Sequence, residues 1–299
     1  MPKRTSADKW TSADLPQMDG RTVVITGAGS GIGLIAAREL ARAGARVIAA
    51  VRDPAKARAA LAGAADPARS VEIRQLDVSD FGSIRAFADA VEGTVDVLVN
   101  NAGVMDIPLQ RTAGGFDLQT ATNYFGPFVL TNLLADRITD RVVSVTSQLH
   151  RRGRLDLGDL DWRTRAYDPM QAYCDSKLAV VLFSLELQRR LTAAGRPVRS
   201  VLAHPGIATT TLAAHSSANR INRLRFLLND PEHGALPTLY AATQDVPANA
   251  YVGPDGLGSI RGYPVVRRPG KAGRDAEVAR QLWGATAALT GVSALAAAA

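Results

Sequence analysis

Short, continuously apolar segments alternate with segments of helical periodicity over the first 200 residues of the chain. Continuous apolar strands separated by helices are typical of a parallel sheet that is buried on both faces. The sequence therefore predicts an α/β fold, a doubly wound parallel sheet of about seven strands flanked by helices. The expected strands include residues 22–26, 46–51, 71–76, 95–100, 141–146 and 197–203.

The alternating pattern predicts a single domain. Between residues 20 and 260, no stretch has the composition of an interdomain linker, and no internal repeat occurs. The expected segments are an N-terminal extension (1–18), the domain itself (19–270) with insertions at 148–170 and about 207–235, and a C-terminal helix and tail (271–299).

Composition excludes several classes of protein. With 299 residues, 46% of them hydrophobic, the chain is long enough to bury one large core. No apolar run of 18 residues is present and the first residues lack a signal-peptide pattern, so we expect no integral membrane span and a cytoplasmic location. Cys174 is the only cysteine and the four histidines are scattered, which predicts neither a disulfide nor a metal site.

The net charge of +7 is carried mostly by arginine. An excess of positive charge can bind nucleic acid, anionic lipid or phosphorylated ligands. The arginines, however, are spread along the chain, and no basic segment is interleaved with aromatic residues. We therefore interpret them as a solvated surface and expect no nucleic-acid partner. A steep salt dependence of nucleic-acid binding would argue otherwise.

The segment VVITGAGSGIG (23–33) places Gly27, Gly31 and Gly33 where the first strand meets the first helix. Glycine is needed where a chain turns tightly and where pyrophosphate oxygens approach backbone N–H groups. The helix N-terminus that follows offers free N–H donors to phosphate. The spacing is G-x3-G-x-G, so this motif alone favours dinucleotide binding but leaves an ordinary tight turn open.

The end of the second strand indicates which dinucleotide is bound. NAD enzymes place an acid there for the ribose 2′-hydroxyl, whereas NADP enzymes need a cation for the 2′-phosphate. Here Val51 occupies the position of the acid, and Arg52 follows it. Arginine suits phosphate because its planar guanidinium donates two hydrogen bonds at once. NADP(H) is therefore favoured over NAD(H), the alternative being that Arg52 pairs only with Asp53.

The segment AYCDSKLAVVLF (172–183) has the pattern of a helix with an apolar face, yet it carries Tyr173 and Lys177. Residues four apart are neighbours on one side of a helix. The phenol and the ammonium therefore share a face near the start of the helix. They form either a solvated surface pair or a device for handling protons.

Six motifs occur together, in the order TGAGSGIG (26–33), NNAG (100–103), NYFG (123–126), VTS (145–147), YCDSK (173–177) and HPG (204–206). With these motifs the chain resembles the short-chain dehydrogenase/reductase family from about Asp19 to past Gly262. Among the branches of this family, the motif sequences are most similar to the retinol-dehydrogenase-like and protochlorophyllide-reductase-like branches. The resemblance implies a Rossmann fold, a nicotinamide cofactor and a homo-oligomer.

The resemblance also implies four catalytic residues. Tyr173 would protonate the carbonyl oxygen during reduction, or accept the proton in the reverse direction. Lys177 would lower the pKa of the phenol and hold the nicotinamide ribose. Ser147 would hydrogen-bond the substrate oxygen, and Asn123 would support a water chain that leads protons to Lys177. Thr146 offers the same hydroxyl as Ser147 and stays as an alternative.

A cofactor-binding set follows from the same resemblance. Asp77 with Val78 would contact adenine, and residues 101–103 would frame the cofactor near the fourth strand. Ile207 and Thr210 would meet the nicotinamide amide. The full set is Gly27, Ser30, Gly31, Ile32, Gly33, Arg52, Asp77, Val78, Asn101, Ala102, Gly103, Tyr173, Lys177, Pro205, Gly206, Ile207 and Thr210.

The chemistry is consistent with these roles. As a hydride reaches a carbonyl carbon, negative charge builds on the oxygen. A phenol can neutralise this charge if its pKa falls toward the working pH from about 10. An ammonium one helical turn away favours the phenolate, which is the required direction. A serine hydroxyl adds a donor to the developing oxyanion.

Four further residues are expected to be structural. Cys174 has no histidine at a usable spacing, so a packing role is favoured over a nucleophilic one. His150 is expected to form hydrogen bonds at the surface or in a loop rather than to contact substrate. His204 is expected to hold a turn, and Asp175 is expected to be solvated.

The sequence thus predicts an NADP(H)-dependent oxidoreductase that transfers a hydride between the nicotinamide and a carbonyl or alcohol (CH–OH) group. The substrate would be a hydrophobic small molecule, such as a retinoid, steroid, lipid aldehyde or polyketide, because the expected lid at about 207–235 is rich in leucine. Those leucines equally fit an ordinary helix core. Reduction of a C=C bond is a less favoured variant. The alternative from another class is an NADP(H)-binding redox sensor without turnover, against which Ser147, Tyr173 and Lys177 argue.

Overall fold

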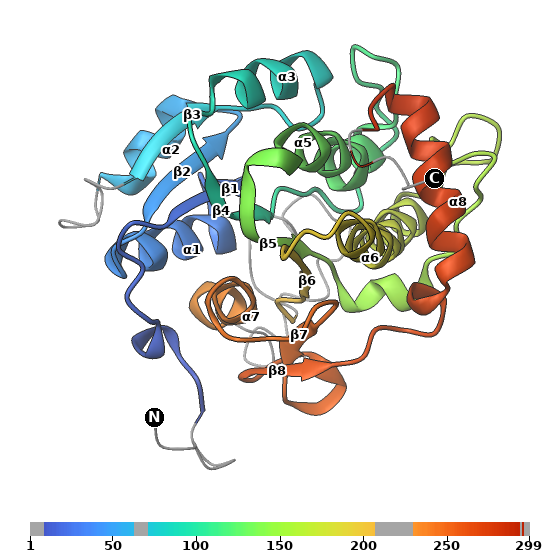
Figure 1. The fold of residues 1–299 in the computed structure, drawn as a ribbon. Coiled ribbons are helices and arrows are strands. Elements are labelled where there is room, and N and C mark those ends of the chain that lie inside the picture. Colours follow the sequence, from blue (N-terminus) through green and yellow to red (C-terminus); the bar gives the residue numbers. More distant parts are fainter. Residues whose placement is uncertain (1–8, 63–70, 207–229, 294, 296–299) are drawn as a thin grey trace.

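The strands of the computed structural model are β1 (Thr22–Thr26), β2 (Arg46–Val51), β3 (Val71–Gln75), β4 (Val95–Asn100), β5 (Ile138–Val145), β6 (Arg199–Ala203), β7 (Tyr251–Pro254) and β8 (Pro264–Arg267). They form one sheet in the order β3-β2-β1-β4-β5-β6-β7-β8 (Figure 1). All neighbouring strands are parallel except β7 and β8. The strand order reverses between β1 and β4, and such a switch point opens a ligand crevice at the carboxyl ends of the strands.

The expected doubly wound parallel sheet is confirmed, and each of the six predicted segments overlaps a strand, although β5 begins three residues before the predicted start. The strand count differs by one from the expected seven because β8 adds an antiparallel edge. This strand has only four residues, and Val266 within it is 48% exposed. An edge strand is buried on fewer sides, so it lacks the continuous apolar run that marks the central strands.

The helices of the described residues are α1 (Gly31–Arg42), α2 (Pro54–Leu61), α3 (Phe81–Ala90), α4 (Leu118–Thr120), α5 (Gly126–Leu134), α6 (Pro169–Ala193), α7 (Pro231–Thr243) and α8 (Ala276–Thr290). They cover both faces of the sheet. Helices α1 and α7 lie over one face, and α3, α5 and α6 lie over the other, with α8 beside α6 (Figure 1). The α1 helix illustrates why a helix packs on the sheet with one face. Its apolar residues recur every three to four positions, and Ala36, Ala37 and Leu40 on that face are fully buried.

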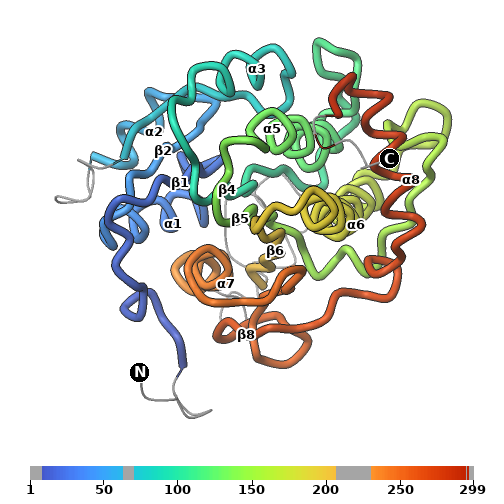
Figure 2. Tube along the Cα trace, viewed as in Figure 1, coloured from blue at the N-terminus to red at the C-terminus, as the bar shows by residue number. Residues whose placement is uncertain are grey.

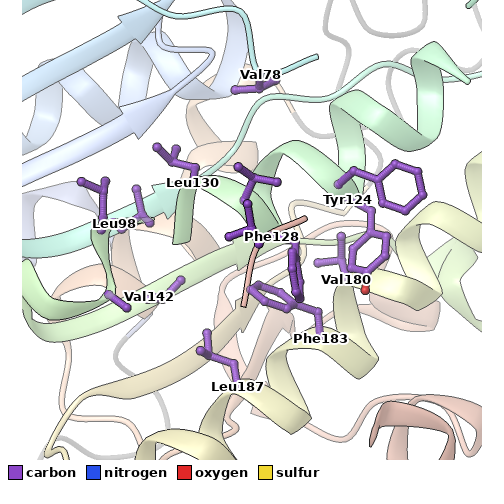
Figure 3. Packing of buried hydrophobic residues seen from close by; sticks show 14 of the residues in the cluster. Val78, Leu98, Tyr124, Phe128, Leu130, Val142, Val180, Phe183 and Leu187 are labelled. Carbon is purple, nitrogen blue, oxygen red and sulfur yellow. The ribbon is translucent and has the colours of Figure 1, made fainter. Parts of the chain in front are cut away.

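An aromatic cluster joins α8 to the rest of the core. Phe128 of α5 and Phe183 of α6 lie with ring centroids 5.7 Å apart, and the Trp283 ring of α8 packs on both of them, at 4.8 and 5.7 Å. Figure 3 shows Phe128 and Phe183 with Tyr124 among the apolar side chains that cover the sheet. The hydroxyl of Tyr124 is 2.6 Å from that of Thr286 in α8. The C-terminal helix is therefore an integral part of the core.

The structure describes residues 9–62, 71–206, 230–293 and 295. Of the expected N-terminal extension, residues 9–18 pack against the domain: Trp10 is 6% exposed, and its ring lies edge-on to Tyr240 at 5.2 Å. Of the expected lid at about 207–235, residues 207–229 lie outside the described residues, and the remainder is the N-cap and first residues of α7. Within the described ranges, no helix is both long and apolar enough to span a bilayer. The homo-oligomer stays a prediction.

Candidate active site

The glycine-rich segment forms the turn between β1 and α1. Gly27 has a φ of +68°, and a Cβ atom there would lie 2.9 Å from the Cα atom of Ala102. A Cβ atom on Gly33 would lie 2.5 Å from the carbonyl oxygen of Gly27. Side chains are therefore excluded at both positions, as a turn that brings backbone N–H groups toward a ligand requires. Ser30 is the N-cap of α1 but forms no capping bond through its side chain, so N–H groups of the first turn stay available.

A cavity of about 330 Å³ lies next to this turn, at the carboxyl ends of the central strands. Its wall contains fourteen of the residues expected to bind the cofactor: Gly27, Ser30, Gly31, Ile32, Gly33, Arg52, Asp77, Val78, Asn101, Ala102, Gly103, Tyr173, Lys177 and Pro205. Gly206 follows Pro205 in the described chain with a φ of +76° but is not part of the wall. Ile207 and Thr210 lie outside the described residues.

The cavity wall carries two exposed cations. Arg52 and Lys56 are both exposed and both belong to the cavity wall. Among the ion pairs of the described residues, none joins Arg52 to Asp53. The Asp53 carboxylate instead caps α2, where it accepts a hydrogen bond from the Lys56 backbone N–H at 3.0 Å. Sequence reasoning missed Lys56, although its position four residues after Arg52 placed it in the first turn of the following helix.

Helix α6 contributes another part of the cavity wall. Asp168 caps this helix by accepting a hydrogen bond from Gln171 N–H at 2.8 Å, and Tyr173 and Lys177 follow on one side. Both side chains are 4% exposed, and both belong to the cavity wall. The Lys177 Nζ atom donates to the backbone carbonyl of Val145 at 3.1 Å and lies 5.7 Å from the Tyr173 ring centroid. The pair is therefore directed into the cavity rather than into solvent.

Burial, and not the neighbouring ammonium, dominates the pKa values of this pair. Desolvation raises the pKa of Tyr173 to about 12, against a smaller lowering by a hydrogen bond with Ser147. Desolvation also lowers the pKa of Lys177 to about 8. Burial thus outweighs any lowering of the phenol pKa by Lys177, whose role in depressing that pKa stays a prediction. The sequence showed the spacing of the two groups but not the loss of solvent around both of them.

The two neighbouring hydroxyls at the end of β5 have different partners. Thr146 Oγ1 donates to the backbone carbonyl of Lys177 at 2.9 Å and is 2% exposed. Ser147 is half-buried, and its Oγ accepts from Leu149 N–H at 3.2 Å; it also lies close enough to the phenol of Tyr173 to lower the pKa of that group. Thr146 is therefore committed to the backbone of α6, and Ser147 is the hydroxyl beside the phenol.

Asn123 lies in η3 (Ala121–Phe125), one turn of π-helix between α4 and α5. Its side-chain oxygen accepts from Val104 N–H at 2.8 Å, and its amide nitrogen donates to Val104 O and to Ser176 Oγ, both at 2.9 Å. A Cβ atom on Gly103 would lie 3.1 Å from Asn123 Oδ1 and 3.5 Å from Lys177 Nζ. Asn123 thus connects the fourth-strand loop to α6, and π-turns of this kind often mark functional sites. The water chain stays a prediction.

Two residues that flank Tyr173 are structural. Asp175, expected in solvent, is 3% exposed: it accepts from Arg154 N–H and from Gln171 Nε2, each at 2.7 Å, and pairs with Arg165 at 3.2 Å. The expectation was wrong because the loop before α6 folds back onto this helix. Cys174 is buried, and burial raises the pKa of its thiol, which does not favour a nucleophilic role.

Comparison with known proteins agrees with this geometry. The family described as short chain dehydrogenase matches residues 21–158. Retinol dehydrogenase 13 of Homo sapiens is 39% identical over 295 residues, covering 92% of this chain and 86% of that protein. Polyprenol dehydrogenase of Mus musculus is 37% identical over 294 residues, covering 93% and 86%.

Solved structures have the same fold. A protein from Mycobacterium paratuberculosis, described as uncharacterized, is 47% identical, with a TM-score of 0.84 over 96% of this chain and 99% of that one. A protein from Beutenbergia cavernae, described as an NAD(P)-dependent gluconate 5-dehydrogenase with NADP bound at low occupancy, is 28% identical with a TM-score of 0.60 over 76% and 91%. From the relatives that match it nearly end to end, the chain belongs to the short-chain dehydrogenase/reductase family, in its retinol-dehydrogenase-like branch.

Proposed function

We propose that the protein is an NADP(H)-dependent oxidoreductase that interconverts a carbonyl and an alcohol on a hydrophobic small molecule. One observation carries this proposal. The wall of one cavity contains a turn whose glycines admit no side chain, two cations and the Tyr173–Lys177 pair, and Ser147 lies close to Tyr173 outside that wall. Groups suited to phosphate binding and to proton transfer in the wall of the same cavity support the proposal.

The wall of the cavity fits a dinucleotide. The glycine turn would receive the pyrophosphate, because a Cβ atom at Gly27 or Gly33 would collide with backbone there. Asp77 and Val78 follow β3 in the same wall, where the adenine would lie. When bound, NADPH supplies the hydride.

The residues of the chain supply the proton. The raised pKa of Tyr173 keeps the phenol protonated at neutral pH, so the proton donor is in its acid form before reduction begins. Its O–H bond breaks as a proton passes to the substrate oxygen, and the resulting tyrosinate lies next to the Lys177 ammonium. An alkoxide is a stronger base than a phenolate, so this transfer is downhill. Ser147 donates to the same oxygen as its charge develops.

The preference for NADP(H) over NAD(H) is supported by Arg52 together with Lys56. A 2′-phosphate carries about two negative charges, which two exposed cations at the end of β2 can pair with. A ribose 2′-hydroxyl would gain little from either cation. The substrate class is supported by the names of the relatives, since retinol and polyprenol are both long apolar alcohols.

The test is consumption of NADPH by the purified protein with a panel of apolar aldehydes and ketones, including retinal and a polyprenal. We expect turnover with at least one of them, and loss of turnover by a factor of at least about 100 in Tyr173→Phe, which removes only the acid. NADPH binding should persist in this variant. Tight NADPH binding by the wild type without turnover on the whole panel would identify the redox sensor instead.

A further inference from the structure

His150 lies next to Ser147, and neither residue belongs to the cavity wall. It belongs to η5 (Gln148–Arg152), the 3-10 helix that Ser147 caps, and it is fully buried. Its Nδ1 atom is 2.6 Å from the backbone carbonyl of Ser147. Its Nε2 atom accepts a hydrogen bond from the backbone N–H of Gly270 at 2.8 Å. His150 is absent from the cavity wall, so it acts on the site only through what it holds.

The two partners of the ring require one protonation state. Gly270 N–H can only donate, so Nε2 must carry a lone pair and no proton. The Ser147 carbonyl can only accept, so Nδ1 must carry the proton. His150 is therefore a neutral imidazole in the Nδ1–H tautomer. A ring protonated on both nitrogens would lose its bond to Gly270.

The segment that contacts Nε2 comes from far along the sequence. Between β8 and α8, the chain passes along the side of α6 (Figure 2). The Arg268 carbonyl accepts from Arg151 Nη2 at 3.0 Å, and a Cβ atom on Gly270 would lie 3.2 Å from His150 Nε2 and 3.1 Å from Arg151 Cγ. The glycine thus allows the backbone to approach the imidazole closely. The Gly270 N–H group holds the imidazole of His150 in place, and the imidazole in turn contacts the backbone carbonyl of Ser147.

A layer of aromatic rings continues from His150 to the cofactor side of the site. The Tyr251 ring of β7 lies edge-on to His150 at 5.6 Å and stacks on His204 at 6.1 Å with an interplanar angle of 8°. His204 Nε2 is 3.1 Å from the Ser259 carbonyl, and the next residue, Pro205, belongs to the cavity wall. The loop that carries Ser147 and the loop that carries Pro205 therefore both pack on the Tyr251 ring, the first through His150 and the second through His204.

We propose that His150 is a positioning residue of the reaction. Its Nδ1–H group adds a second bond to the Ser147 carbonyl, which also accepts from the His150 backbone N–H at 3.0 Å, and so restrains the serine hydroxyl next to Tyr173. Its Nε2 atom takes its own position from Gly270. This inference rests on the proposed function for its kinetic consequence, but the hydrogen-bonding state of the imidazole is independent of any turnover.

Two conservative substitutions separate the two contacts. The amide of asparagine reaches as far as Nδ1 of histidine, so His150→Asn keeps a donor for the Ser147 carbonyl and loses the bond to Gly270. The amide of glutamine reaches as far as Nε2, so His150→Gln keeps an acceptor for Gly270 and loses the bond to Ser147. His150→Phe removes both polar contacts, and His233→Asn, on the outer surface of α7, is the control.

We expect kcat for carbonyl reduction to fall about tenfold in His150→Gln and to stay within about twofold in His150→Asn, with KM for NADPH unchanged in both. His150→Phe should resemble His150→Gln or be worse. Equal kcat in the Asn and Gln variants, or a KM effect as large as the kcat effect, would overturn the proposal.

An independent measurement covers the case without turnover. Long-range ¹H–¹⁵N NMR spectra of the histidine-labelled wild type should show one imidazole in the neutral Nδ1–H tautomer at pH 7, absent in His150→Phe. An Nε2–H tautomer or a charged ring would refute the assignment even in an active enzyme. If the tautomer is as proposed but the wild type reduces no substrate, the proposed function has failed and the geometry of His150 stands.

Discussion

The side chain of Thr146 donates to the backbone carbonyl of Lys177, so the residue that follows β5 is attached to the helix that carries Tyr173 and Lys177. The Lys177 ammonium in turn donates to the carbonyl of Val145. These reciprocal bonds hold the strand end and the helix in one geometry. The neighbouring Ser147 is thereby free to face the phenol.

The two hydroxyls at the end of β5 should respond differently to removal. We expect Thr146→Val to lower the free energy of unfolding by about 1–2 kcal/mol, because a buried carbonyl loses its donor. Ser147→Ala should lower the unfolding free energy by about 0.5–1 kcal/mol, because η5 loses its cap, but lower kcat about 100-fold, because a donor to the developing oxyanion is lost. Urea denaturation and NADPH consumption measure the two effects. A larger kcat loss in the valine variant than in the alanine variant would reverse the assignment.

The two cations at the end of β2 should determine the choice between the dinucleotides. Arg52→Ala should weaken NADPH binding about 10- to 100-fold and NADH binding by less than about twofold, because only the 2′-phosphate loses a charge-assisted bond. Lys56→Ala should act in the same direction with a smaller loss. Arg58→Ala is a matched control, since Arg58 is an exposed cation of α2 outside the cavity wall. Fluorescence titration gives the dissociation constants. Equal losses for NADPH and NADH would refute the 2′-phosphate contact.

The lowered pKa of Lys177 should appear in cofactor binding. In the protein without cofactor the pKa is about 8, so the ammonium loses its proton, and its charge, as pH rises through 8. We expect the dissociation constant for NADPH to increase between pH 7 and 9.5, while Tyr173, with its pKa near 12, stays neutral throughout. In Lys177→Met, binding should be weaker but flat over this range. If the dissociation constant of the wild type for NADPH is as independent of pH as that of Lys177→Met, the pKa of Lys177 lies outside the range from pH 7 to 9.5.

The glycine turn should not tolerate a methyl group. Gly33→Ala brings a Cβ atom against the Gly27 carbonyl, so we expect NADPH binding to weaken at least about 100-fold and the turn to lose stability. Gly284→Ala is the control. It lies in α8 with no atom near the added Cβ, and alanine there should stabilise the protein by about 0.5–1 kcal/mol. Calorimetry of both variants with and without NADPH measures these effects. Unchanged NADPH binding by Gly33→Ala would show that the cofactor does not use this turn.

The sequence by itself determined the features that depend on local periodicity and local steric need. The central strands are continuous apolar runs, and the strand-to-helix turn at Gly27 requires residues without a side chain. The i, i+4 spacing placed Tyr173 and Lys177 on one side of α6. Each of these features depends on a few neighbouring residues, and so each could be predicted from the sequence alone.

Only the tertiary structure decided how these groups are bonded and solvated. Asp175 is buried because Arg154 and Arg165, from the preceding loop, fold against it, and the local sequence contains no signal of that contact. His150 is fully buried because Gly270, 120 residues later, lies against its ring. The pKa of Tyr173 is raised because elements distant in sequence exclude water from the phenol. Spacing along one helix fixes direction, whereas burial depends on every segment that packs around a group, and only the folded chain brings those segments together.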